Sequence, residues 1–299
     1  MPSPTDFNLS PYFDDFNESK KFHRVLFRPA FAVQARELTQ SQTLLQNQIE
    51  KFGDHIFKQG SIVIPGGVAF DDKYYAVKLT SIASANTLAQ FTTGTIITGG
   101  TSGVVAEIIG TDALSGSDPD TLYVKYEKTG TNNTAFVFSD GETITGTNSD
   151  SVSLSCVCST TATGSAAIGA AGTYYINGYF VQADAETLIL DKYTNTPSYR
   201  IGYTITESFV TPNDDATIND NATGSSNVNA PGAHRFKILL TLTKKTLAST
   251  EDSNFFEILR VEDGRIKGQA RATEYNILAE TLPRRTFDES GDYVLTNPE

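Results

Sequence analysis

The chain has 299 residues and a formal net charge of −12, with 19% charged and 39% hydrophobic residues. This balance excludes the clustered positive field that nonspecific binding to nucleic acid or to an anionic membrane requires. No apolar run approaches the roughly 20 residues of a membrane span, and 13 Tyr and 18 Phe are too many for a disordered chain. We expect a folded, mainly β protein that does not insert into a membrane.

Residues 1–29 predict an aromatic N-terminal arm. Tyr12, Phe13 and Phe16 are the side chains that we expect to dock, either on the arm's own domain or on a neighbour. The arm also carries the one basic cluster of the chain: Lys20, Lys21, His23, Arg24 and Arg28. We interpret that cluster as a source of ion pairs within the protein rather than as a phosphate site.

Residues 30–58 predict a long helix. Its apolar positions alternate in steps of four and three, which is the repeat of a coiled-coil seam. The predicted seam consists of Phe31, Ala35, Leu38, Gln42, Leu45, Ile49, Phe52 and Ile56. Gln42 places an amide in the seam, where it would fix register. The seam is an oligomer or partner interface in the favoured interpretation; alternatively, a single amphipathic helix lies on its own β domain.

The rest of the chain predicts an antiparallel β domain formed by residues 59–85 and 161–247, with a small inserted β barrel or sandwich at 86–160. Asn177-Gly178 and Asp263-Gly264 are expected to form tight hairpin turns. Residues 248–299 predict a hairpin, a short helix that stops near Pro283 and the start of a further strand. This predicts a fold that is α+β and mainly β, and a natural chain that continues beyond Glu299.

A search for chemistry in the sequence finds no catalytic, cofactor or metal motif, so we expect neither an enzyme nor a cofactor. Cys156 and Cys158 are too close for a disulfide and have no His nearby for zinc, so they are expected to be reduced thiols. The loop with Asn213-Asp214-Asp215 and Asn219-Asp220-Asn221 could offer oxygen ligands to Ca²⁺. Hydrogen bonding within Asx turns is the favoured interpretation.

Three stretches carry a resemblance: "YFDDFNESKKFHRVLFRPAFAVQARELTQSQTLLQNQIEKFGDHIFKQGSIVIPG", "DNATGSSNVNAPGAHRFKILLTL" and "PRRTFDESGDYVL". They resemble a family of structural proteins of tailed-bacteriophage tails and baseplates that carries a domain of unknown function. The resemblance implies a virion component, often the proximal part of a fibre, and brings no catalytic residues with it.

These observations predict a structural component of a phage tail baseplate or proximal tail fibre, assembled in the host cytoplasm. We expect a homo-oligomer, with a trimer favoured, that contacts other tail proteins. The alternative is a receptor-binding module in which residues 86–160 contact glycans on the host surface. A tail-borne depolymerase is disfavoured because no pair of carboxylates at a fixed separation is evident.

Overall fold

The computed structural model describes residues 4–64, 66–222, 224–270 and 276–291. It is mainly β, with 44% strand and 15% helix. The α-helices are α1 (Ala35–Asp54) and α2 (Asn276–Ser290). The strands are β1 (Ser61–Ile64), β2 (Gly67–Ile82), β3 (Ile96–Gly99), β4 (Val105–Asp112), β5 (Thr121–Lys128), β6 (Thr143–Thr147), β7 (Ser153–Ala170), β8 (Gly172–Ile176), β9 (Tyr179–Ala183), β10 (Glu186–Asp191), β11 (Tyr199–Val210), β12 (Arg235–Thr246), β13 (Phe255–Glu262) and β14 (Arg265–Gln269).

The predicted fold with a long, coiled-coil-like helix over residues 30–58 is wrong, although the mainly β character is consistent with the structure. Helix α1 has only 20 residues. Ala30, which follows Pro29, has a left-handed φ of 68°, a conformation that no L-residue keeps inside a right-handed helix. The first turn begins after Gln34, whose N–H donates to Glu37 Oε2 (3.0 Å). Phe31 and Ile56 of the predicted seam therefore lie outside α1.

The segment predicted as an inserted domain forms most of a closed barrel. Strands run in the order β7-β2-β5-β4-β3-β6, and β6 pairs back onto β7. The barrel interior is filled by apolar side chains such as Ile97, Ile108 and Leu122, all fully buried. Strands β2 and β7 continue past the barrel and remain paired from Gly67–Ala170 to Ile82–Cys156. The barrel is therefore an extension of the body's own strands.

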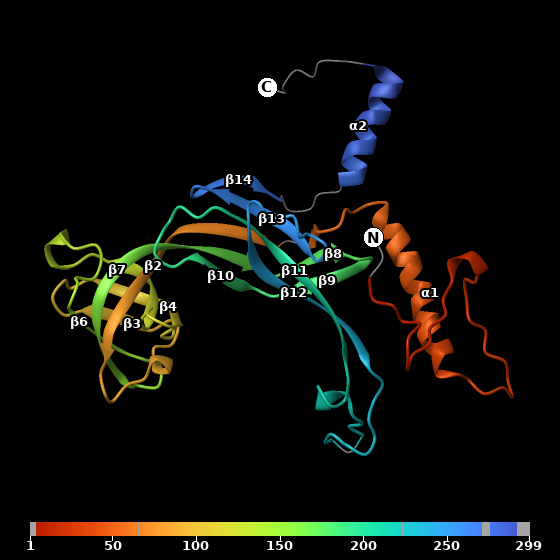
Figure 1. Ribbon diagram of the computed structural model, residues 1–299, viewed down its shortest axis with the longest axis horizontal. Helices are drawn as coiled ribbons and strands as arrows, with labels where there is room; N and C mark the ends of the chain where they lie inside the picture. The colour runs from red at the N-terminus through yellow and green to blue at the C-terminus, as the bar shows by residue number, and fades with distance from the viewer. Residues whose placement is uncertain (1–3, 65, 223, 271–275, 292–299) are drawn as a thin grey trace.

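The body of the molecule is built from the other ends of β2 and β7 together with two further sheets, β1-β8-β9 and β12-β11-β13-β14. These layers share one apolar core, in which Tyr174, Tyr203 and Phe256 stack with ring centroids 5.1–5.8 Å apart. In Figure 1 the barrel lies at one end of this body and α1 at the opposite end, beside β8 and β9.

Both predicted tight turns are confirmed. Asn177 and Gly178 join β8 to β9 with φ of 49° and 85°, and Asp263 and Gly264 join β13 to β14 with φ of 48° and 72°. Two consecutive positive φ values are those of a type I′ turn, which matches the twist of the flanking strands.

Strands β11 and β12 form a long hairpin that projects from the body (Figure 1). They pair without interruption from Tyr199–Thr246 to Val210–Arg235. Helix α2 stands apart from the body in the same view, and its described side chains, at residues 281–290, are exposed. The predicted helix stop at Pro283 is wrong, because α2 continues through Pro283 to Ser290. The predicted terminal strand falls at residues 292–299, outside the described residues.

A charged cluster connects the barrel loop between β4 and β5 to the body. Lys192 Nζ lies 2.5 Å from Asp112 Oδ2 and 3.0 Å from Asp118 Oδ2. The Tyr193 hydroxyl donates a short hydrogen bond to Asp118, and Lys78 Nζ sits 3.8 Å from the centroid of the Tyr193 ring. These contacts hold the barrel against the segment that follows β10.

Glu142 is a buried carboxylate that organises two barrel turns. Its oxygens accept hydrogen bonds from the N–H groups of Thr101 (2.9 Å), Ser102 (2.8 Å) and Ser139 (2.7 Å), and from Ser102 Oγ (2.8 Å). Burial alone would raise the pKa of Glu142, but these hydrogen bonds outweigh it, so the pKa lies below the ordinary value. The carboxylate is therefore a stabilising group in its ionised form.

We expect Glu142→Gln to destabilise the protein by about 1–3 kcal/mol at pH 7, because the charged acceptor of four donors is lost. The stability from the carboxylate is fully present above the ordinary pKa of about 4.3 and disappears as pH falls through the lower folded pKa. The difference in melting temperature between wild type and variant should therefore shrink from pH 7 to pH 3. The exposed Glu127→Gln is the control, and an equal loss in both variants would contradict this role.

Gly202 sits at a bulge where β11 meets β13, and a Cβ there would lie 1.9 Å from the carbonyl oxygen of Phe256. We expect Gly202→Ala to cost about 1–3 kcal/mol, because backbone must shift to admit the methyl group. Gly268→Ala in β14 is the matched control, since the nearest atom to its Cβ is 3.9 Å away. Thermal unfolding followed by circular dichroism should show a lower midpoint for the first variant only.

Candidate interaction surface

Helix α1 docks on the body through its polar side. Gln46 Nε2 donates to the Gly178 carbonyl (2.7 Å) in the β8–β9 turn. The Tyr175 hydroxyl donates to Asp54 Oδ1 (2.8 Å), and it also lies 2.9 Å from the carbonyl of Glu50. These contacts hold the C-terminal half of α1 against β8 and β9.

Gly53 permits the close approach of α1 to the sheet. It is buried, and a Cβ added to it would lie 2.5 Å from the Tyr175 ring. Gly53 is therefore the point at which the helix meets the sheet. The neighbouring Phe57 ring lies 5.6 Å from that of Tyr175 and continues the contact.

The predicted seam faces away from this contact. The large apolar seam residues within α1 are all exposed: Leu38 by 52%, Leu45 by 67%, Ile49 by 44% and Phe52 by 66%. Ala35 and Gln42 are exposed as well, Phe31 is exposed in the segment before α1, and Ile56 is half-buried after it. Leu44, which lies on another side of the helix, is the buried leucine of α1.

The arm before α1 binds its own chain at two places. Phe7 packs edge-on to Phe236 (5.1 Å between centroids) and Tyr12 stacks on Phe209 (5.0 Å), so the arm lies on the β11–β12 hairpin. The Tyr12 hydroxyl and His234 Nδ1 are hydrogen-bonded at 2.8 Å. Of the other predicted docking residues, Phe16 is half-buried and Phe13 is 55% exposed.

The second place is α1 itself. Asp14, 4% exposed, accepts hydrogen bonds from Thr43 Oγ1 and Gln40 Nε2, and Glu18 pairs with Lys51 near the end of the helix. The Asp14 contact could not be predicted from the sequence, because an aspartate in a polar arm is expected to be solvated unless its partners on the helix are known. Residues 4–20 are thus fixed between the hairpin and α1.

The loop considered for Ca²⁺ uses its carboxylates internally. Asp214 accepts hydrogen bonds from the N–H (2.9 Å) and Oγ1 (2.7 Å) of Thr211, and Asp215 accepts those of Thr217 (2.9 and 2.7 Å). These hydrogen bonds lower the pKa of each carboxyl. Among the described residues, no group of three or more His, Cys, Asp or Glu is arranged to hold a metal ion.

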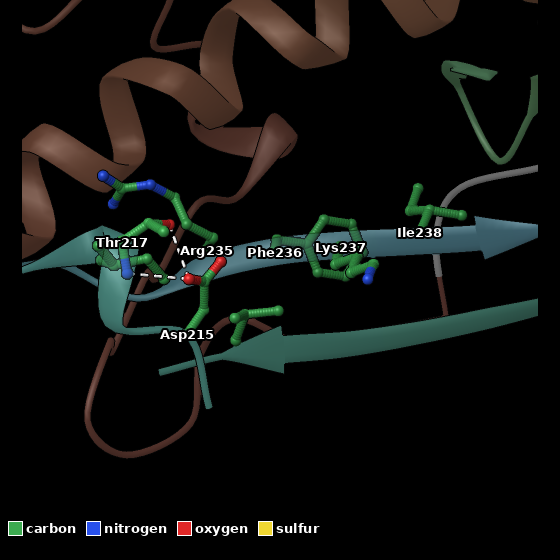
Figure 2. A pocket seen from close by; sticks show the side chains of 8 residues that line it. Asp215, Thr217, Arg235, Phe236, Lys237 and Ile238 are labelled. Carbon is green, nitrogen blue, oxygen red and sulfur yellow. Dashed lines mark hydrogen bonds between the residues drawn. The ribbon is translucent and has the colours of Figure 1, made fainter. Parts of the chain in front are cut away.

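A pocket of about 680 Å³ lies beside this loop, near the end of the β11–β12 hairpin (Figure 2). Phe236 and Ile238 contribute apolar surface, and Arg235 and Lys237 contribute cations. Arg235 Nη1 donates to the carbonyl of Ala233 (2.7 Å). Asp215, which also lines the pocket, is already hydrogen-bonded to the N–H and Oγ1 of Thr217.

The two cysteines lie inside the barrel and are both free. Burial raises the pKa of Cys156 to about 12 and that of Cys158 to about 11. Because the thiolate is the reactive form, neither thiol is a nucleophile near neutral pH. Within the described residues, no helix is long and apolar enough to cross a membrane.

The family described as "Domain of unknown function (DUF4815)" matches residues 10–105 and 112–297. The chain belongs to this family. No curated protein and no solved structure matches the chain. The DUF4815 match takes in the arm, α1, the barrel and the body.

We expect Asp14→Ala to release the arm of this DUF4815 chain from α1, because it removes a buried charged acceptor of two hydrogen bonds. The loss of about 1.5–3 kcal/mol should speed amide exchange by roughly 10- to 100-fold at Tyr12, Phe13 and Asp14, whose N–H groups bond to Leu9 and Phe7 carbonyls. Hydrogen exchange with mass spectrometry measures this. The exposed Asp6→Ala is the control, and unchanged exchange in the Asp14 variant would contradict the contact.

Proposed function

We propose that this protein is a structural component of a phage tail baseplate or proximal tail fibre, and that it assembles as a homo-oligomer, with a trimer favoured. The exposed apolar seam of α1 is the observation that carries the proposal. A monomer rarely leaves a contiguous apolar stripe in water, and such a stripe marks an interaction site. The resemblance of the arm, helix and C-terminal motifs to phage tail proteins supports the virion setting.

The geometry of α1 supports assembly through the seam in particular. The helix is held to its own body by hydrogen bonds on its polar side, so its apolar side is available without any rearrangement. Each fully buried seam side chain contributes roughly 1.5–3 kcal/mol. Leu38, Leu45, Ile49 and Phe52 together would contribute roughly 6–12 kcal/mol, which must also offset the freedom that the chains lose on association.

The remaining features fit a passive building part. The thiols are buried with raised pKa values, and the ionised loop carboxylates are engaged in turns. Partners would be other copies and other tail proteins. The alternative of glycan binding by residues 86–160 is not favoured by a specific observation, since the pocket described above lies near the end of the β11–β12 hairpin.

Leu45→Asp combined with Ile49→Asp tests the assembly. The wild type should have an oligomeric mass by light scattering, and the variant should be a folded monomer. Losing two buried side chains costs roughly 3–6 kcal/mol per chain, which weakens association by about 10²- to 10⁴-fold. The control is Leu114→Asp with Val228→Asp. These residues lie outside α1 and are 66% and 76% exposed, so this variant should remain oligomeric. A monomeric wild type would refute the assembly.

The virion setting needs its own measurement. Antibodies raised against the purified protein should decorate the tails of purified phage particles in electron micrographs. Decoration of heads, or of no particle, would refute a tail component even if the protein oligomerises.

A further inference from the structure

A second unpartnered surface lies directly before α1. We define the strap as residues 21–34, which run from the end of the docked arm to the start of the helix. Its large apolar side chains at Phe22, Leu26, Phe27, Phe31 and Val33 are exposed, Leu26 by 77%. The seam of α1 adds four more exposed apolar side chains, those of Leu38, Leu45, Ile49 and Phe52. Together these nine are more than a third of the 25 exposed large hydrophobic side chains among the described residues, and all nine fall within residues 22–52.

The strap's main chain is also unpartnered. Between Phe22 and Val33 the described structure has one hydrogen bond between main-chain groups, from Phe31 N to the Arg28 carbonyl (3.4 Å). Apart from a turn at residues 29–30, the segment has no regular secondary structure. A segment with free N–H and C=O groups and apolar side chains has the properties of a peptide that docks in a groove or along another element.

Both ends of the strap are fixed beside its own helix. Glu18 pairs with Lys51 at the C-terminal end of α1, and Gln34 leads into the N-terminal end. Even so, the chain leaves the strap and its own seam uncovered. Since 14 extended residues reach about 46 Å and α1 is about 30 Å long, a strap can follow the whole length of a neighbouring α1.

Charge favours a second copy of this chain as the occupant. The strap carries Lys21, Arg24 and Arg28 and no acidic residue. Subtracting these three from the 23 Lys and Arg leaves 20 against 35 Asp and Glu, so the rest of the chain has a net charge of −15. A basic strap is therefore attracted to another copy, and its cations suit the negative C-terminal end of α1 near Asp54.

The exposed apolar area also matters. Nine side chains that each expose roughly 100 Å² amount to about 900 Å² on each copy. In a ring this area is divided between the strap that a copy gives and the seam that it offers, so one strap-to-seam contact buries about 900 Å² from its two partners together, near the lower end for a specific interface. A helix-to-helix contact would cover the seam and leave the strap in water. A strap-to-seam contact covers both at once.

We propose that the strap of one copy lies along the α1 seam of the next, antiparallel to the helix, so that Leu26 packs near Leu45. This inference rests on the proposed assembly and identifies the strap as the element that joins one copy to the next. The assembly is then an exchange of straps around a ring, with each copy giving one strap and receiving another.

Cysteine crosslinking tests the contact, because Cys156 and Cys158 are buried and have raised pKa values. A full-length Leu26→Cys chain and a full-length Leu45→Cys chain with a larger tag are co-expressed and treated with a short bismaleimide. Each chain then has one reactive thiol, so a product of mixed size joins the strap of one copy to the seam of another. Leu114→Cys replaces Leu45→Cys in the control.

The expected result is a mixed-size product formed at least tenfold faster than in the control pair. If the protein is oligomeric by light scattering but the mixed-size product forms only at the control rate, the strap contact is overturned and the assembly is retained. Leu45→Cys chains that crosslink mainly to each other would overturn it in favour of seam against seam. A monomeric mixture would overturn the assembly itself.

Discussion

The docking of α1 by its polar side is the constraint on which the rest of the surface depends. Gln46 binds the β8–β9 turn, and Gly53 lets the helix lie against Tyr175. A helix that docked through its apolar stripe would have buried that stripe within its own chain. Because hydrogen bonds and the close approach at Gly53 hold α1 instead, its hydrophobic side is left exposed.

The arm strengthens this arrangement. Asp14 is buried against Thr43 and Gln40, so the docked part of the arm occupies a further side of α1 with polar contacts. The body and the docked part of the arm thus contact α1 on sides other than its apolar stripe. That stripe remains exposed, with the strap beginning and ending near the two ends of the helix.

Local signals in the sequence predicted local structure well. Asn177-Gly178 and Asp263-Gly264 formed the expected turns because positive φ is decided by those residues themselves. The seam periodicity also predicted which side of α1 is apolar. The helix bounds were wrong because the left-handed Ala30 follows from the path of the strap, and the apolar residues of that strap happen to continue the heptad spacing.

The long-range contacts could not be predicted from the sequence. The glutamines and threonines of α1 looked solvated, yet Gln46 and Thr43 bind partners more than 25 residues away. The segment 86–160 was interpreted as an insertion because its strands are short. The pairing of β2 with β7, which makes this segment continuous with the body, joins residues that are between 74 (Ile82 and Cys156) and 103 (Gly67 and Ala170) positions apart. Such pairing is set by packing in the core and leaves no periodic trace in either strand alone.

The continuity of β2 and β7 has a mechanical consequence. A barrel attached to the body by a flexible linker could rotate or be displaced without any change in the structure of the body. Here, tension between the two ends of the molecule is carried by two covalent backbones side by side, with a ladder of hydrogen bonds resisting their sliding past each other. A force applied at the barrel therefore reaches the body through paired main chains rather than through a single linker.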